Sequence, residues 1–234
     1  MSTLISEAIP PCQNKGVAFM MGRMQPPTKG HYKVIDKMKE FIRENPSLKL
    51  EAKPIVIIIN GGKSSHDKIK NPLTVDDRIS IMQSSGNANG VIFISAKNAF
   101  DAIVQMRKKG FEPIAIGAGS DRAKSYMDLL TKSFPLTSDH SGERVIISGL
   151  NRDNVSSNDK KIDKDKAISN ALAKLEINGD LEDDEISGSI ARRAVELGWV
   201  DEFAEIVGLG KKPELAKILF KKLKKAFASG ENNK

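Results

Sequence analysis

Cysteine is almost absent from this chain of 234 residues, because Cys12 is the only one, and so no disulfide can form within the molecule. A lone cysteine is typical of proteins from a reducing compartment, and we therefore expect the cytoplasm. No apolar run approaches the roughly 20 residues that a membrane-spanning helix requires. Residues 1–11 lack the basic start and the long apolar stretch of a secretory signal peptide, and we expect none.

Several residue patterns that carry chemistry in other proteins are also missing. The three histidines, His31, His66 and His140, are widely separated, and no pair of carboxylates stands beside the first of them, so we expect no metal held by the protein itself. The chain has no G-x-x-x-x-G-K-[ST] loop and no recognisable nucleophile constellation. Aromatic residues are sparse at 5%, but a hydrophobic content of 39% is sufficient for a core.

Positive charge is in excess, with a formal net charge of +7 and a pI of about 9.3, which suits nucleotides or nucleic acid as partners. Much of the excess lies in segment 211–234, where Pro213 and Glu214 open a basic amphipathic helix. We favour docking of its apolar stripe on the body of the protein. The alternatives are contact with nucleic acid, a membrane surface or an acidic partner. The stripe consists of Leu215, Ile218, Leu219, Leu223 and Phe227.

Short runs rich in Val and Ile alternate with segments of helical periodicity. This alternation predicts an α/β fold: a Rossmann-like parallel sheet with helices on both faces, plus C-terminal helices. A ligand crevice is then expected at the carboxyl ends of the strands. The predicted strands are 17–21, 55–60, 91–95, 114–117 and 145–148, and the predicted helices are 28–43, 75–84, 99–109 and 122–132.

Composition divides the chain into an N-terminal extension (1–14), a central domain (15–210) and the basic helix and tail (211–234). Within the central domain, residues 151–185 are rich in turn-forming and charged residues and interrupt the alternation. We interpret them as an insertion, either a lid over the crevice or, as we favour, a solvated surface excursion.

Residues 22–31, with the sequence GRMQPPTKGH, directly follow the first predicted strand. Two prolines forbid a helix across them, and Thr28 then opens the first helical pattern. Gly30 allows close packing of the backbone, and His31 lies in the first helical turn. Unpaired N–H groups and a positive partial charge make a helix start a natural phosphate site, to which an imidazole and a hydroxyl can donate hydrogen bonds.

A second helix start lies far downstream, in residues 186–193, with the sequence ISGSIARR. Ser187, Gly188 and Ser189 are ordinary capping residues, but capping does not explain Arg192, whose guanidinium can point back at a phosphate. The two segments together indicate a nucleotide triphosphate held between two helix starts.

These segments resemble the nucleotidyltransferase superfamily, whose signatures are a (His/Thr)-x-Gly-His turn and an Ile-Ser-x-(Thr/Ser)-x-x-Arg helix start. Within it, the chain resembles the archaeal type of nicotinamide-mononucleotide adenylyltransferase, which opens with Gly-Arg-(Phe/Met)-Gln-Pro as residues 22–26 do. A middle signature of that type is a Ser-His pair, then (Asn/Asp)-Pro-Phe-Thr and Glu-Arg, and residues 65–66, 71–74 and 77–78 are similar to it. The resemblance runs from about Gly16 to about Phe203, apart from the insertion.

The chain departs from that type at two points. Thr28 replaces the first histidine of the turn, as in cytidylyltransferase-like and phage-encoded versions of the motif. The archaeal enzymes stack a mid-chain tryptophan on nicotinamide, whereas the only tryptophan here, Trp199, follows the last motif. The nucleotide half of the site is therefore expected to be intact, and the identity of the acceptor stays open.

The resemblance implies roles for individual residues. The expected catalytic residues are His31, Thr28, Lys70 and Arg192, of which Lys70 matches a basic residue that grips phosphate in relatives. Ser65, His66 and Asn71 are expected on the acceptor side. The expected nucleotide-binding residues are Gly22, Arg23, Met24, Gly30, His31, Gly117, Asp121, Ile186, Ser187, Ser189 and Arg192.

The implied reaction transfers an adenylyl group from ATP or another NTP to a phosphate-bearing acceptor, with nicotinamide mononucleotide as first choice, and releases pyrophosphate. Mg²⁺ is expected to enter with the NTP, held mainly by phosphate oxygens and water. One alternative is a cytidylyltransferase-like enzyme acting on a phosphorylated alcohol or sugar. Another is a phage-type structural or binding protein, located in a virion, that retains the nucleotide pocket while its basic tail contacts a polyanion. Self-association stays open.

Overall fold

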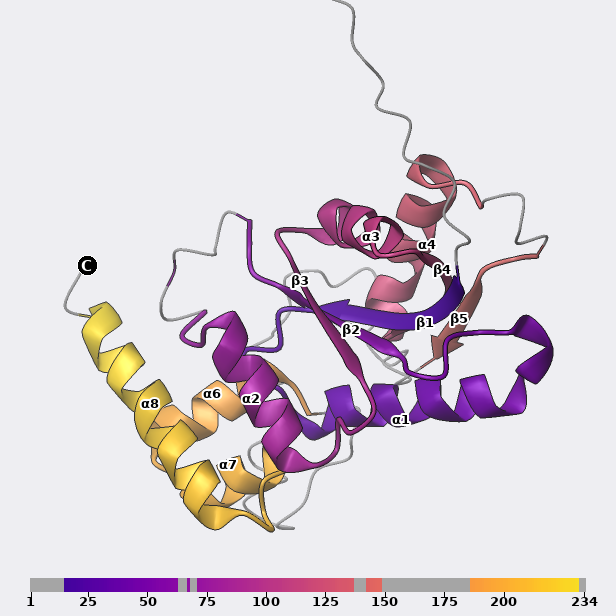
Figure 1. The fold of residues 1–234 in the computed structure, drawn as a ribbon. Helices are drawn as coiled ribbons and strands as arrows, with labels where there is room; N and C mark the ends of the chain where they lie inside the picture. The colour runs from indigo at the N-terminus through magenta and orange to yellow at the C-terminus, as the bar shows by residue number, and fades with distance from the viewer. Residues whose placement is uncertain (1–14, 63–66, 68–70, 137–141, 149–185, 232–234) are drawn as a thin grey trace, which may run out of the picture.

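A parallel sheet forms the centre of the computed structural model, which describes residues 15–62, 67, 71–136, 142–148 and 186–231. Within these residues, five strands run in the order β3-β2-β1-β4-β5 (Figure 1). All four pairings between neighbouring strands are parallel, so the predicted α/β, Rossmann-like fold is confirmed. The strands are β1 (Lys15–Gly22), β2 (Ile55–Ile59), β3 (Ile92–Ala96), β4 (Phe111–Ala118) and β5 (Val145–Ser148).

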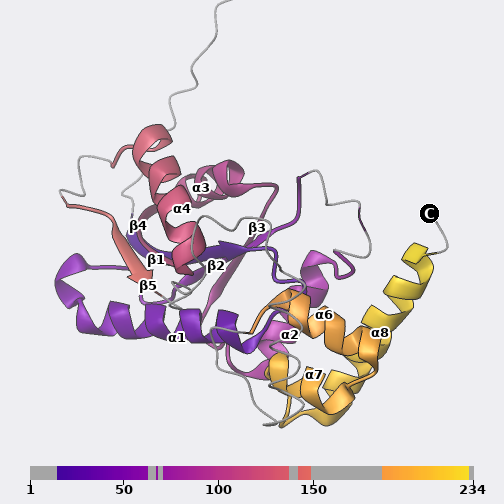
Figure 2. The same cartoon turned by 180° about the vertical axis from the view of Figure 1, so that it is seen from behind.

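Helices cover both faces of the sheet because both faces are apolar. Alternate residues of β1 point to opposite sides: Val17 and Phe19 pack under α3 and α4, while Ala18 and Met20 pack under α1 and α2. Figures 1 and 2 show α3 and α4 on one side of the sheet and α1 on the other. These helices are α1 (Lys29–Glu44), α2 (Val75–Ser85), α3 (Ala99–Lys108) and α4 (Ser120–Ser133), and a short 3₁₀ turn, η1 (Pro46–Leu48), follows α1.

Strand β4 begins three residues earlier than the periodicity predicted, at Phe111 instead of residue 114. Pro113 lies inside the strand, and the register with β1 shifts opposite it, between Val17 and Ala18. A proline cannot donate to the ladder, so an irregularity beside it lets the strand continue. The early start places Glu112 within the sheet, with its side chain fully buried.

Glu112 is compensated by two arginines at the amino-terminal end of the sheet. Its Oε1 atom accepts hydrogen bonds from Arg107 at 2.8 Å and from Arg144 at 3.0 Å. Arg144 also donates to the carbonyl oxygens of Pro113 and Leu130, at 2.9 and 3.1 Å. This charged cluster fastens the start of β5 to β4, at the end of the sheet away from the segments predicted to bind nucleotide.

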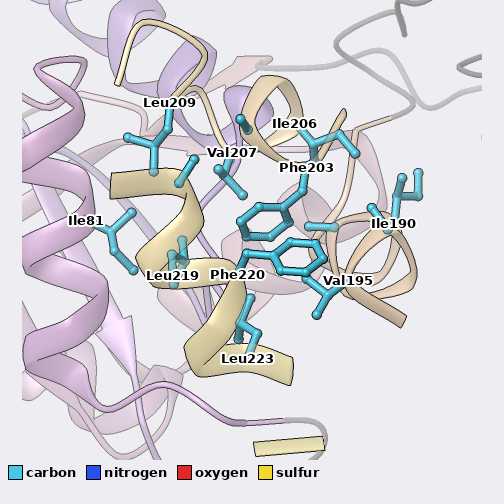
Figure 3. Packing of buried hydrophobic residues seen from close by; sticks show 14 of the residues in the cluster. Ile81, Ile190, Val195, Phe203, Ile206, Val207, Leu209, Leu219, Phe220 and Leu223 are labelled. Atoms are coloured by element: carbon cyan, nitrogen blue, oxygen red, sulfur yellow. The ribbon is translucent and has the colours of Figure 1, made fainter. Parts of the chain in front are cut away.

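Helices α6 (Gly188–Leu197), α7 (Val200–Ile206) and α8 (Pro213–Glu231) build a separate hydrophobic core against α2. Figure 3 shows Phe203 and Phe220 at its centre, where the two rings meet edge to face with centroids 5.5 Å apart. Ile81 of α2 belongs to the same cluster and joins it to the body of the protein. The structure therefore has the C-terminal helix docked on the body of the protein, the arrangement that we favoured from the sequence.

The buried side of α8 differs from the predicted stripe, because it includes Ala216 and Phe220, whereas Leu215 is only partly buried and Ile218 is exposed. Ile218 was expected in the stripe, but its side chain is 65% exposed, and Phe220 is buried instead. The buried positions follow helical spacing from Ala216, and that spacing places residue 218 on the opposite side of the helix. The residues that line the buried side are Ala216, Leu219, Phe220, Leu223 and Phe227.

The predicted extension 1–14 and the predicted insertion 151–185 lie outside the described residues. Within the part of the chain that the structure describes, no helix is both long enough and apolar enough to cross a membrane.

Candidate functional site

The two central strands end at one edge of the sheet, and the candidate site is built there. Phe19 of β1 pairs with Ile116 of β4, so Gly22 and Ala118 close the two strands side by side. From β1 the chain proceeds outward through β2 and β3 and then returns to β4 on the other side of β1. Ligands of open α/β sheets bind at such a reversal of strand order, outside the carboxyl ends of the strands.

The turn between β1 and α1 is held in place by the burial of Met24 and by hydrogen bonds of Gln25. Met24 has φ = 51°, a left-handed conformation that is uncommon outside glycine, and its side chain is buried in the core under α1. The side-chain amide of Gln25 clamps the backbone of Leu73, donating to its carbonyl at 2.7 Å and accepting from its N–H at 3.0 Å. The turn is therefore fixed to the segment that precedes α2.

Thr28 and His31 form a closed pair at the start of α1. The backbone N–H of Thr28 donates to Nδ1 of His31 at 3.1 Å, and the Thr28 hydroxyl lies 2.9 Å from the same atom. Because Nδ1 accepts the backbone hydrogen bond, a neutral His31 ring carries its proton on Nε2. Thr28 itself is fully buried, whereas His31 is half-buried.

The second predicted segment arrives at the same turn. Ser187 caps α6, since its side chain accepts from the N–H of Ile190. A Cβ atom on Gly188 would lie 3.0 Å from the carbonyl oxygen of Gln25, a tight contact, so the two backbones approach closely here. Arg192 donates to that carbonyl oxygen and, at 3.1 Å, to the hydroxyl of Ser189. The two predicted segments are therefore brought together.

Arg192 is half-buried, and its surroundings shift the pKa of its guanidinium. Burial lowers the pKa of its guanidinium, and the negative charges of Glu196 and Asp67 oppose that shift. An arginine guanidinium carries a positive charge in proteins at neutral pH. Arg23 is exposed, and its Nη2 atom lies 4.0 Å from the position that a Cβ atom would take on Gly62. Positive charge therefore stands on two sides of the turn that carries His31.

The other predicted site residues have varied surroundings. Gly30 is buried within α1, and Ile186 is buried in the core of α6, α7 and α8. Gly117 faces α1 so closely that a Cβ atom would lie 2.7 Å from Val34, which makes this glycine a packing requirement. Asp121 follows β4 in the first turn of α4. Lys70, Ser65 and His66 lie outside the described residues.

Arg78 was not among the predicted site residues, although the Asp77-Arg78 pair belonged to the middle signature. Its side chain is 2% exposed and donates to the carbonyls of Ile59 and Thr74, both at 3.0 Å, and also to that of Arg23. Burial lowers the pKa of Arg78 to about 10, with Asp77 opposing the shift, so the group stays charged at neutral pH. Arg78 thus fastens the ends of β1 and β2 together.

A cavity of about 360 Å³ opens beside this arginine, at the carboxyl end of β2. Its walls come from the ends of β1 and β2, from the segment that leads into α2, and from Ala226 of α8. Asn71, which we expected on the acceptor side, lines this cavity. The described residues contain no group of three histidine, cysteine, aspartate or glutamate side chains placed to hold a metal ion.

Comparison with known proteins agrees with this geometry. The family model of the cytidylyltransferase-like proteins matches residues 19–161, more than half of the chain. The chain belongs to the cytidylyltransferase-like family. It is thereby a nucleotidyltransferase, as the resemblance implied, with its nucleotide and acceptor unspecified. The matched region includes the Thr28–His31 turn and Arg78, but it ends before α6, α7 and α8. No curated protein matches the chain.

Proposed function

We propose that this cytidylyltransferase-like protein transfers an adenylyl group from ATP to a phosphate-bearing acceptor, with nicotinamide mononucleotide as first choice, and releases pyrophosphate. The observation that carries the proposal is the meeting of both helix starts at one turn, where Arg192 contacts the Gln25 carbonyl and His31 follows three residues after Thr28. Two helix starts and two cationic side chains at a strand-order reversal form a strong setting for a triphosphate.

In the proposed mechanism, a phosphate oxygen of the acceptor attacks the α-phosphorus of ATP, and the bond to the pyrophosphate leaving group breaks. The acceptor is already an anion, so its oxygen needs no proton removed by a strong general base. Positioning of the two substrates and stabilisation of the developing negative charge then provide the catalysis. Mg²⁺, held mainly by phosphate oxygens and water, would neutralise the charge on the leaving pyrophosphate.

His31 and Arg192 are the proposed contacts to the phosphates, and Arg23 and Lys70 add positive charge. The proton on Nε2 equips the neutral His31 ring to donate toward a phosphate oxygen. We propose that Thr28 positions His31 and does not make the phosphate contact that the sequence had suggested. Thr28 is fully buried, its N–H donates to Nδ1 of His31, and its hydroxyl lies beside the same atom. The helix start after β4, with Gly117 and Asp121 beside it, and the Ser187–Ser189 region are proposed to surround the rest of the nucleotide.

A second candidate is cytidylyl transfer from CTP to a phosphorylated alcohol or sugar. The match to the cytidylyltransferase-like model favours it, as does threonine at position 28 in place of the first histidine of the turn. Both candidates use the same phosphate site and differ in the base of the NTP and in the acceptor.

The test is a matrix of the four NTPs against nicotinamide mononucleotide, glycerol 3-phosphate and sugar phosphates, followed by release of pyrophosphate in the presence of Mg²⁺. Turnover with ATP and nicotinamide mononucleotide supports the first candidate, and turnover with CTP and a phosphorylated alcohol supports the second. His31→Ala should lower turnover about 100-fold, the scale of one preorganised donor. A protein that releases no pyrophosphate with any combination would contradict both candidates.

A further inference from the structure

We propose that the outward side of α8 binds the phosphate backbone of a nucleic-acid duplex without reading its base sequence. This surface, the lysine face, consists of the exposed side chains Lys217, Ile218, Lys221, Lys222, Lys224 and Lys225. It lies beyond residue 161, where the match to the family model ends, and it shares no residue with the proposed nucleotide site. The proposal therefore stands independently of the proposed function.

Positive charge on the lysine face has little acid to oppose it. Residues 215–230 contain five lysines and no aspartate or glutamate. Lys217 pairs with Glu214 at 3.0 Å, and Lys222 pairs with Asp77 of α2. The other three lysines form no ion pair within the part of the chain that the structure describes. Three cationic side chains are therefore available to an anionic partner.

These three lysines, Lys221, Lys224 and Lys225, lie on one side of the helix, because residues three and four apart are neighbours on a helix surface. Lys217 precedes Lys221 by one turn on the same side, so the row from 217 to 225 extends over about 12 Å at a rise of about 1.5 Å per residue. Each strand of B-form DNA carries a phosphate about every 3.4 Å along the axis, and a row of this length can face about three of them.

Docking of α8 holds the row in place and leaves it facing solvent. Figure 3 shows Leu219, Phe220 and Leu223 on the opposite side of the helix, within the core shared with α6 and α7. Docking on the body and contact with a partner therefore use opposite sides of α8 and are compatible. A helix that is already ordered also loses less conformational entropy on binding than a disordered basic segment does.

The same packing argues against a lipid surface as the partner. An interfacial helix inserts its apolar side among the lipids. In α8 that side is occupied by the protein core, where Phe220 and Leu223 are buried. Ile218 is the single large apolar residue of the lysine face, and its side chain is 65% exposed. The lysine face can therefore approach a membrane only through its charge.

The residue types of α8 favour a duplex over a single strand or an acidic protein. Bases of a single strand stack on exposed aromatic side chains, but Phe220 and Phe227, the aromatic residues of α8, are both buried. Binding hot spots between proteins are enriched in Trp, Tyr and Arg, and residues 213–229 contain none of these. Lysine is a point charge on a flexible stem, which suits the evenly repeated phosphates of a duplex.

The test measures fluorescence anisotropy of a labelled DNA duplex of about 20 base pairs and arbitrary sequence, titrated with the full-length protein from about 50 to about 200 mM salt. The test variant changes the three unpaired lysines of the lysine face and carries Lys221→Gln, Lys224→Gln and Lys225→Gln. The matched control changes three exposed lysines of α3 and α4 and carries Lys108→Gln, Lys124→Gln and Lys132→Gln. Both variants lose the same charge, and Figures 1 and 2 show α3 and α4 far from α8.

The wild-type protein and the control should bind the duplex with Kd values of about 1–100 µM, the range of sequence-independent binding near physiological salt. The logarithm of their binding constants should fall steeply as the logarithm of the salt concentration rises. In the test variant this slope should be shallower by about 2.7, because each phosphate contact contributes about 0.9. Equal slopes in the two variants, or no duplex binding by the wild-type protein, would overturn the proposal.

Acetylation footprinting of the full-length wild-type protein gives a second measurement that does not depend on the folding of a variant. Saturating duplex should lower the acetylation of Lys221, Lys224 and Lys225 several-fold. It should leave the three lysines of α3 and α4 unchanged. Equal protection of both groups, or protection of the second group alone, would overturn the assignment to the lysine face.

Other polyanions distinguish the class of partner. A single DNA strand of the same sequence, phosphatidylserine vesicles and polyglutamate are compared with the duplex at equal salt and equal negative charge. Weaker binding of all three supports the proposal, and equal or tighter binding of any one of them would overturn it. An RNA duplex of the same sequence is titrated as well. Binding of either duplex supports the proposal, and the tighter of the two identifies the source of the phosphates.

Discussion

The guanidinium of Arg192 donates a hydrogen bond to the backbone carbonyl of Gln25, across 167 residues of sequence. This one contact joins the segment after β1 to the start of α6. Gly188 lies close to the same carbonyl oxygen, where a Cβ atom would be 3.0 Å away, a tight contact. The position of the arginine in the site therefore depends on how closely the two backbones approach.

Substitution of that arginine tests the phosphate site. Arg192→Lys retains the charge but loses the fork that holds Gln25 and Ser189 together, so we expect kcat to fall about 100-fold. The matched control is Arg193→Lys. Arg193 is exposed, and its one described ion pair, at 2.8 Å, is with Glu196 on the same helix. Steady-state pyrophosphate release measures both variants. Equal activity of the two would contradict the role of Arg192.

Thr28→Val tests the positioning of His31. Valine keeps the volume and the backbone N–H at position 28 but removes the hydroxyl that lies 2.9 Å from Nδ1. We expect kcat to fall about tenfold, the scale on which an orienting partner of a functional histidine acts. Thr28→Ser should retain nearly full activity.

The tautomer of His31 in Thr28→Val is followed by ¹⁵N chemical shifts of the ring. The backbone N–H at position 28 still donates to Nδ1 in the variant, so the Nε2–H form is expected in both proteins, and the ¹⁵N shift of Nδ1 should change because the hydroxyl contact is lost. A purely structural role of Thr28 would lower stability while leaving both the Nδ1 shift and kcat of the folded fraction unchanged, and this result would refute the positioning role.

Glu112→Gln tests the charged cluster at the opposite end of the sheet. The change leaves Arg107 and Arg144 without their buried counter-charge, so we expect the free energy of unfolding to fall by about 3–5 kcal/mol. Glu51→Gln is the matched control, because its partner Lys15 is more than half exposed. Such a pair contributes about 1 kcal/mol or less. Denaturant titration measures both, and equal losses would contradict the assigned burial.

Acidification tests the attachment of α8 to α2. Partial burial favours the neutral form of Asp77, but hydrogen bonds from Lys222 and Thr74 outweigh it and hold the pKa of this carboxyl below its ordinary value of 3.8. The unfolded chain therefore takes up this proton first as the pH falls. The stabilisation is complete above the ordinary value and is lost as the pH falls through the lower native value.

The measurement compares the free energy of unfolding of the wild-type protein with that of Asp77→Asn from neutral pH to pH of about 3. We expect the wild-type advantage at neutral pH to shrink as the pH falls below the ordinary value of the carboxyl. A difference between the two proteins that is independent of pH would show that the charge of Asp77 does not contribute.

Much of the fold could be predicted from the sequence, because strand and helix periodicity is local. The five predicted strands and the helix starts at Thr28 and Ser187 reappear in the structure, with β4 extended backward past Pro113. Sequence reasoning missed Arg78, although its motif was recognised, because a buried arginine held by backbone carbonyls has no distinct sequence signal. It also placed Ile218 in the buried stripe, because an apolar residue at near-helical spacing does not reveal which way the helix is turned.

The sequence by itself determined the parallel sheet, the cap residues of α1 and α6, and the cationic residues near the two helix starts, since each follows from neighbours within a few positions. Only the tertiary structure decided that Thr28 is buried beside His31, that Gln25 contacts both Arg192 and Leu73, and that Ala226 lines the cavity. The physical reason is that these contacts arise from close packing of segments distant along the chain. Small residues such as Gly188 and Ala226 allow that packing, but their identity in the sequence does not indicate which segment will pack against them.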